Sequence, residues 1–131
     1  MISEGELYEG STWEALLFAT HHKLDNLFII LDVNNLIILG KTSDCLSLDP
    51  IIAKFKSFGL NTYNCNGHNF NSIDNAFRKI KKNGKPHCVI INTTKGKGIS
   101  FMEDQANWHY WNPLNEKTIN ITKQKLKNEK Y

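Results

Sequence analysis

Two segments of the chain carry oxygen-bearing side chains at positions where a cation could be bound. Glu4 stands beside Gly5, and Asn34 follows thirty positions later, directly after an apolar stretch. Hard cations such as Mg²⁺ prefer oxygen ligands and commonly bridge to phosphate groups. Spacing alone does not separate such a site from two ordinary turns, since acidic turns and asparagines at strand ends are common.

A third segment combines a flexible loop with an imidazole. The stretch TTKGKGIS at 93–100 is punctuated by glycines, and His109 follows it between Trp108 and Tyr110. Its neighbours allow two interpretations of His109. It is either a loop residue packed among aromatic rings or a group that takes part in chemistry.

Two further carboxylates accompany the start of a predicted helix. Ser11 and Glu14 have the spacing of a capping box, and apolar residues then recur at helical intervals, which predicts a helix over residues 12–23. Glu9 and Glu14 could stabilise the N-terminus of this helix by about 0.3 to 1 kcal/mol. A role in chemistry is the alternative, and the residues alone leave both open.

Helical and strand patterns alternate along the chain. Beyond the first helix they predict strands at 27–32, 60–65 and 87–92. One further helix is predicted with Asp49 as N-cap and Pro50 at the first helical position, ending at Gly59. Another is predicted with Asn71 or Ser72 as cap and with Asn83 and Gly84 at its end. This alternation is typical of an α/β fold in which a mostly parallel sheet lies between flanking helices, giving three layers. Ligand sites of such folds lie beyond the carboxyl ends of the strands, where the residues singled out above fall.

Composition narrows the class of protein. The chain has 131 residues, of which 40% are hydrophobic, and a net charge of +3 that is too small to indicate a nucleic-acid partner. Its three cysteines have no CxxC spacing, so we expect reduced thiols and a cytoplasmic location. The longest apolar run, 27–31, is too short to cross a bilayer, and we expect no membrane partner. We assign 1–113 to one domain and 114–131 to a Lys-rich tail.

Several dissimilar sequence blocks resemble, in the same order, those of transketolases. The blocks are EGELYEGSTWEA, KLDNLFIILDVNN, KFKSFG, NGHN, GKPHCVIINTTKGKGISFME and NWHYWNP. The resemblance runs from about Ser3 to Pro113 and concerns the latter part of the thiamine diphosphate-binding domain, the N-terminal section where the enzyme is split into two chains. The α subunit of 2-oxo acid dehydrogenases is an alternative family, but EGSTWEA and the KGKGISFME and WH blocks favour transketolase.

The resemblance implies a thiamine diphosphate enzyme that transfers a two-carbon ketol unit between sugar phosphates. It implies Mg²⁺ ligands at Glu4, Asn34 and the carbonyl of Leu36, and further cofactor contacts from Gly5, Glu6 and His109. Catalytic roles would fall to three residues: Glu9 and Glu14, near the subunit contact and the proton relay of the cofactor, and His109, near the diphosphate and substrate.

The sequence departs from the family pattern at its start. Ser3 and Glu4 replace the family's first glycine and its metal-binding aspartate, and the longer side chain of Glu4 is expected to weaken Mg²⁺ binding. We expect the fold to be incomplete, with the strand that should lead to Glu4 missing together with the upstream half and the pyrimidine-binding domain. Activity would then need further chains, namely a C-terminal transketolase section, a second copy, or both. The alternative is a degenerate, non-catalytic fragment or interaction module.

Overall fold

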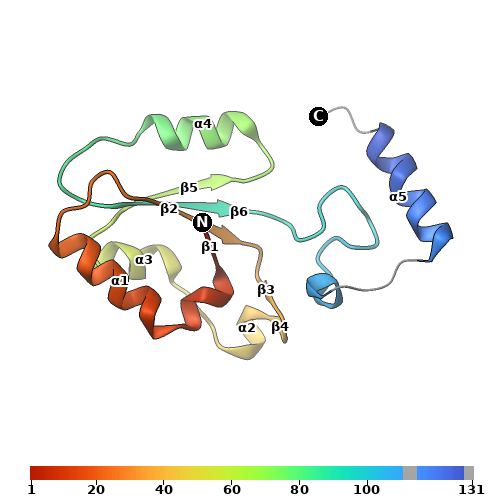
Figure 1. Cartoon of the computed structure of the whole chain (residues 1–131), viewed down its shortest axis with the longest axis horizontal. Coiled ribbons are helices and arrows are strands. Elements are labelled where there is room, and N and C mark those ends of the chain that lie inside the picture. The colour runs from red at the N-terminus through yellow and green to blue at the C-terminus, as the bar shows by residue number, and fades with distance from the viewer. Residues whose placement is uncertain (111–114, 129–131) are drawn as a thin grey trace.

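A parallel sheet of four strands forms the centre of the computed structural model, which describes residues 1–110 and 115–128. The strands lie in the order β1-β2-β6-β5, with the bounds Ile2–Ser3 for β1, Phe28–Val33 for β2, Asn61–Asn66 for β5 and His87–Asn92 for β6. All three neighbouring pairs are parallel. Their carboxyl ends therefore meet at one edge of the sheet (Figure 1).

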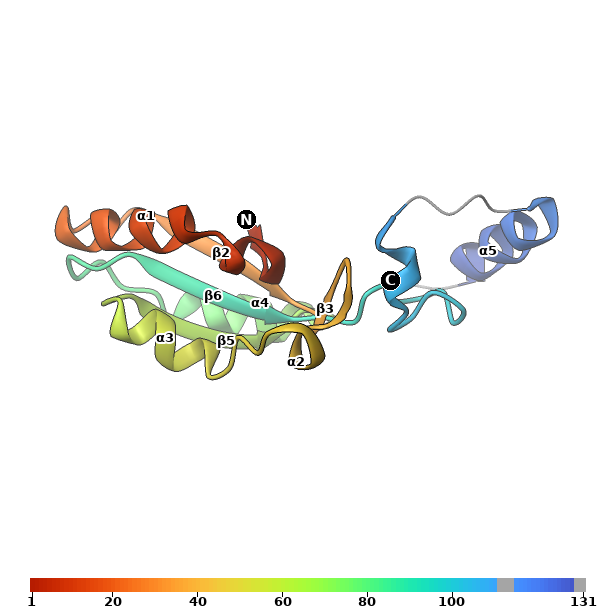
Figure 2. The same cartoon turned by 90° about the horizontal axis from the view of Figure 1, so that it is seen from below.

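Helices cover both faces of the sheet. On one face, α1 (Gly10–His21) and α3 (Ile51–Ser57) pack over a core that includes Leu31 and Phe55, neither of which is exposed to solvent. On the other face, α4 (Phe70–Arg78) packs over a smaller cluster around Val89. The two views in Figures 1 and 2 show this arrangement. The predicted α/β fold with three layers is confirmed.

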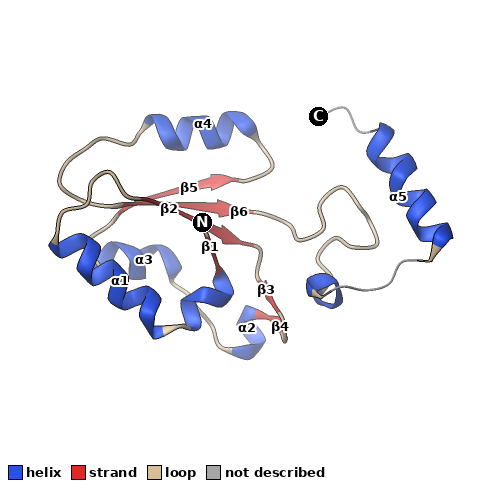
Figure 3. Ribbon diagram, in the orientation of Figure 1, coloured by secondary structure: helices blue, strands red, loops and turns tan. Residues whose placement is uncertain are grey.

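Short elements follow the strands at their carboxyl ends, as the colouring in Figure 3 shows. They are the 3₁₀ helix η1 (Glu4–Tyr8), the hairpin β3 (Leu36–Ile37) and β4 (Gly40–Lys41), the short helix α2 (Thr42–Cys45), and the 3₁₀ helix η2 (Ala106–His109). None of these was predicted from the sequence.

A last helix, α5 (Glu116–Asn128), lies apart from the sheet (Figures 1 and 2). Within the described residues, the ammonium group of Lys125 donates a hydrogen bond to the hydroxyl of Ser100. The predicted domain boundary between 113 and 114 lies outside the described residues. No described helix combines the length and the apolar character needed to cross a membrane.

Three predicted helix starts were wrong by one to three residues, and one predicted helix end was too late. In α3 the extended Pro50 is the N-cap in place of Asp49, and α4 ends at Arg78 before the predicted Asn83 and Gly84. The first helix begins at Gly10, because Glu9 is extended and its carbonyl accepts the N–H of Thr12 at 3.2 Å. Ser11 is thus already inside the helix and forms no capping box. In α4, the side chain of Asn69 accepts the N–H of Ser72 at 2.8 Å, so the cap precedes both predicted positions.

The strand expected to be missing before Glu4 is partly present. Ile2 pairs with Leu31 and Ser3 pairs with Asp32, both in parallel register. These two residues of β1 deliver Glu4 to the carboxyl edge of the sheet, next to the end of β2.

Candidate functional site

The carboxyl edge of the sheet brings together residues that are far apart in the sequence. Glu4 follows β1, Asn34 follows β2, and Thr93 follows β6. Backbone hydrogen bonds continue the sheet past its strands: the N–H of Thr93 donates to the carbonyl of Val33 at 2.9 Å. The loops after these strands are therefore held against one another.

Glu4 makes the central contact of this edge. Its side chain is 2% exposed, and its Oε2 accepts the N–H of Asn34 at 2.8 Å and the N–H of Asn35 at 2.7 Å. Asn35 has a φ of 60°, a left-handed conformation that asparagine tolerates better than most residues. The carboxylate thus shapes the turn after β2.

Electrostatics around Glu4 leave its charge uncompensated. Burial raises the pKa of Glu4, and the two backbone N–H groups only partly oppose this, while the nearby carboxylates of Asp32 and Asp49 raise it further. The two ion pairs in the described part of the chain, Arg78 with Asp74 and Lys97 with Glu103, do not involve Glu4. A bound cation would supply the opposite charge.

The side chain of Asn34 is fixed at both ends of its amide. Oδ1 accepts the N–H of Leu36 at 3.0 Å, and Nδ2 donates to Oδ2 of Asp32 at 3.1 Å. Oδ1 of Asp32 in turn accepts the hydroxyl of Thr93 at 2.5 Å. Neither Asp32 nor Thr93 was predicted. The position of Asp32 could have indicated it, because residues two apart in a strand share a face.

His109 reaches the same region from the segment that follows β6. Its element, η2, is in contact with β3, the strand that begins at the buried Leu36. The imidazole is exposed, and its ring centre lies 5.8 Å from that of Tyr110. Trp108 anchors the turn, because its indole N–H donates to the carbonyl of Phe101 at 3.1 Å. His109 is thus carried on a fixed turn while its own ring is open to solvent.

The remaining predicted residues lie on η1 and α1. Gly5 and Glu6 are exposed, and the Glu6 carboxylate accepts the N–H of Ser3 at 2.8 Å. Glu9 ends η1, and Glu14 lies on the exposed face of α1. Among the described residues, neither of these last two carboxylates hydrogen-bonds to Glu4 or Asn34.

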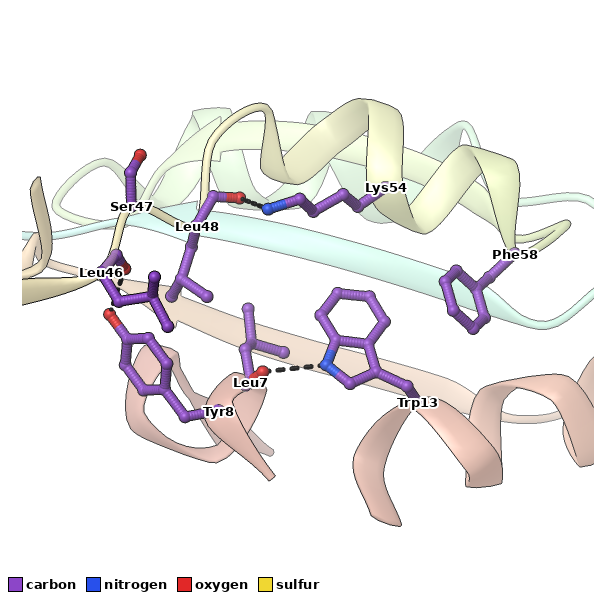
Figure 4. Close-up of a pocket in the computed structure, with 8 residues that line it drawn as sticks. All are labelled: Leu7, Tyr8, Trp13, Leu46, Ser47, Leu48, Lys54 and Phe58. Atoms are coloured by element: carbon purple, nitrogen blue, oxygen red, sulfur yellow. Dashed lines mark hydrogen bonds between the residues drawn. The ribbon is translucent and has the colours of Figure 1, made fainter. Parts of the chain in front are cut away.

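A groove of about 510 Å³ lies between η1 and α1 on one side and the α2–α3 segment on the other (Figure 4). It is lined by Leu7, Tyr8, Trp13, Leu46, Ser47, Leu48, Lys54 and Phe58. Three polar side chains of the groove donate hydrogen bonds to backbone carbonyls of other lining residues. The Tyr8 hydroxyl donates to Leu46, the Trp13 indole N–H to Leu7, and the Lys54 ammonium group to Leu48. No predicted site residue is among these lining residues.

Comparison with known proteins identifies the family. Residues 1–131 match the family described as "Transketolase, thiamine diphosphate binding domain". The chain belongs to this family. Transketolase is thus favoured over the 2-oxo acid dehydrogenase alternative, and the predicted N-terminal section is confirmed.

The chain is also similar to individual transketolases. The chain is 44% identical over 129 residues to one of the subunits of apulose-4-phosphate transketolase from Actinobacillus succinogenes, covering 98% of this chain and 46% of that protein. It is 41% identical to the corresponding protein of Phocaeicola vulgatus, covering 88% of this chain and 42% of that one. The crystal structure of Campylobacter jejuni transketolase superposes with a TM-score of 0.83 at 32% identity, over 94% of this chain and 19% of that one. The chain therefore spans less than half the length of these two curated relatives.

Glu4 and Asn34 of this transketolase-family chain carry oxygen atoms of the kind that a divalent cation takes. No group of three or more His, Cys, Asp or Glu side chains suited to a metal exists among the described residues, so a cation would need amide and carbonyl oxygens as well. Glu4 uses one carboxylate oxygen for the turn, and Oε1 accepts no hydrogen bond in the described part of the chain. The Oδ1 atom of Asn34 has a second lone pair beyond the one used by Leu36. Such an oxygen-only set is of the kind that Mg²⁺ takes.

Proposed function

We propose that this chain belongs to the cofactor-binding part of an enzyme that transfers a two-carbon ketol unit between sugar phosphates, using thiamine diphosphate and Mg²⁺. The observation that carries the proposal is the buried contact of Glu4 with Asn34 at the carboxyl edge of the sheet. The family match to a thiamine diphosphate-binding domain supports it.

The chain's own residues would divide the work as follows. Glu4, Asn34 and the carbonyl of Leu36 would hold the cation and, through it, the diphosphate, beside Gly5 and Glu6. Thiamine diphosphate supplies an electron sink for the carbanion when it is bound. The exposed imidazole of His109 would hydrogen-bond to the diphosphate and the substrate.

The carboxylates of Glu9 and Glu14 are proposed to meet a partner chain. Both side chains are exposed, one at the junction of η1 and α1 and the other on the outer face of α1. From a subunit contact they would reach the aminopyrimidine of a cofactor held between two chains. We propose that a C-terminal transketolase section, a second copy, or both complete the site.

The names of three similar proteins support an anionic ketose as the substrate class and a second chain as the partner. Two are subunits of apulose-4-phosphate transketolases, and a third, from Clostridium sp., is a 6-deoxy-6-sulfo-D-fructose transketolase subunit. These names share a ketose that carries an anionic phosphate or sulfo group, and they describe subunits. We propose an anionic ketose as the donor here.

We also propose a cytoplasmic location. Cys45 is exposed and unbridged, while Cys65 and Cys88 are unbridged and buried. Free thiols of this kind are typical of a reducing compartment.

Turnover in the presence of the partner tests the proposal. The chain is mixed with a C-terminal transketolase section, thiamine diphosphate, Mg²⁺, a ketose phosphate donor and an aldose acceptor. We expect transfer of the ketol unit, and its loss when Asn34→Ala replaces the wild type. Absence of turnover would contradict the proposal, and absence of metal-dependent cofactor binding as well would support the degenerate fragment or interaction module.

A further inference from the structure

We propose that Asp32 is a positioning residue that fixes the orientation of the Asn34 amide, and that Thr93 in turn holds Asp32. The side-chain amide of Asn34 lies at the candidate cation site. The importance of its orientation for cofactor binding therefore rests on the proposed function. The orientation itself rests only on contacts within this chain. Nδ2 of Asn34 donates to Oδ2 of Asp32 at 3.1 Å, and the Thr93 hydroxyl donates to Oδ1 of Asp32 at 2.5 Å.

The chemistry of an amide makes its orientation matter. One end of the Asn34 side chain carries two donors and the other end carries an acceptor, and only the acceptor can bind a cation. Asp32 is an acceptor at both oxygens when ionised, so it selects the NH₂ end of Asn34. Oδ1 is thereby directed to the turn after β2, where it meets the N–H of Leu36 at 3.0 Å.

Thr93 ties this arrangement to the centre of the sheet. Its N–H donates to the carbonyl of Val33 at 2.9 Å while its hydroxyl holds Asp32. The register of the sheet requires this placement: Asp32 pairs with Ile91 and Val33 with Asn92, so Thr93 stands just beyond the last pair. A connected series of hydrogen bonds therefore runs from the end of β6 through the end of β2 to the turn that follows it.

Asp32 could act in two ways, by orienting the Asn34 amide or by attracting a cation with its negative charge, and the two roles predict different effects of mutation. Asp32 also places a negative charge near Glu4, which could attract a cation without any effect on Asn34. Asp32→Asn separates the two roles, because it removes the charge but keeps an oxygen that can accept the Nδ2 hydrogen of Asn34. Asp32→Ala removes both.

The matched control is Asp25→Ala. Asp25 is also half-buried and also accepts a hydrogen bond, from the N–H of Gly84 at 3.2 Å, but it lies before β2 and thus at the opposite edge of the sheet. Its removal should cost stability without any effect on Asn34.

The experiment combines two measurements on the full chain. The first is the ¹H–¹⁵N spectrum of the Asn34 side-chain NH₂ group without ligand, and the second is calorimetric titration with thiamine diphosphate in Mg²⁺ in the presence of a C-terminal transketolase section. We expect Asp32→Ala to shift the NH₂ signals and to weaken binding about 10- to 100-fold, the usual effect of losing a residue that orients a metal ligand. Asp32→Asn should keep most of the affinity, and Asp25→Ala should change neither measurement.

Three results would overturn the proposal. They are unchanged Asn34 NH₂ signals in Asp32→Ala, a loss of affinity in Asp32→Asn equal to that in Asp32→Ala, and an effect of Asp25→Ala as large as that of Asp32→Ala. A wild-type chain that binds no cofactor even with a C-terminal transketolase section present would refute the proposed function, and the NH₂ signals would still decide whether Asp32 orients Asn34.

Discussion

The carboxylate of Glu4 accepts the backbone N–H of Asn34 at 2.8 Å and so ties the end of β1 to the end of β2. The same oxygen also accepts the N–H of Asn35. Glu4 replaces an aspartate in the family pattern, and its longer side chain reaches the backbone of the next loop while the second carboxylate oxygen stays available. The turn and the proposed cation binding would thus depend on different atoms of one side chain.

Glu4→Gln should stabilise the cation-free protein at pH 7. Glutamine keeps an oxygen for the two backbone N–H groups and removes a charge that burial disfavours. Glu4→Ala is the comparison, because it leaves both N–H groups unpaired and should cost about 1 to 3 kcal/mol. Urea unfolding in the presence of a chelator measures both. Equal destabilisation by the two variants would contradict this account.

The pH dependence of the unfolding free energy should show the destabilising effect of the buried Glu4 charge. The folded-state pKa of Glu4 is raised above its usual 4.5, so the folded state holds the proton more tightly than the unfolded state. Its contribution to stability is therefore complete below pH 4.5 and is lost as pH rises through the folded-state pKa. The difference in unfolding free energy between Glu4→Gln and wild type should grow from near zero at acidic pH towards neutrality. A difference that shrinks as pH rises would be inconsistent with a buried carboxylate.

Gly67→Ala should disturb the turn after β5. An added Cβ would lie 2.3 Å from the Cγ2 of Ile91 and 2.6 Å from the Cγ2 of Thr93. Overpacking of this kind costs about 1 to 3 kcal/mol. Gly10→Ala is the matched control, since an added Cβ there meets nothing within 4 Å. Denaturant melts of the two variants should differ accordingly, and equal stability would argue against the packing described.

His109→Asn should lower turnover without changing stability. The imidazole is exposed and makes only an edge contact with Tyr110 among the ring contacts of the described residues, so its loss should change the unfolding free energy by less than about 0.5 kcal/mol. Because His109 is proposed to hydrogen-bond to the charged diphosphate and the substrate, turnover with the partner chain should fall about 10- to 100-fold, which corresponds to the loss of about 1.5 to 3 kcal/mol. Tyr110→Phe is the control and should keep full turnover. A variant at His109 with normal turnover would remove this residue from the site.

Patterns within single segments predicted the main elements of the fold. The strands β2, β5 and β6 lie within about a residue of their predicted bounds. The strands β2 and β6 are short, largely apolar runs, whereas β5 is a weaker pattern with three asparagines among its six residues. Helix starts were less accurate, since Glu9 and Asn69 decide them through backbone conformation and a side-chain bond. The two-residue strand β1 is too short to give any pattern, and only pairing with β2 reveals it.

The candidate site was predictable only in part. Glu4 and Asn34 could be expected to meet, since parallel strands place their carboxyl ends at one edge. That Glu4 binds the backbone of the next turn depends on the left-handed residue Asn35, which no pattern specifies. The role of Thr93 depends on the register of β6 against β2, a property of two segments far apart in the sequence, with Asp32 and Thr93 separated by 61 positions.

Paramagnetic broadening offers the most direct test of the central claim that Glu4, Asn34 and Leu36 hold a divalent cation with the diphosphate. Mn²⁺ replaces Mg²⁺ because both suit oxygen ligands, and amide signals are recorded with thiamine diphosphate and a C-terminal transketolase section present. The account predicts broadening of the signals of these three residues, while that of His87, at the other end of six-residue β6 and roughly 20 Å away, stays sharp. Uniform broadening, or broadening centred elsewhere, would contradict it.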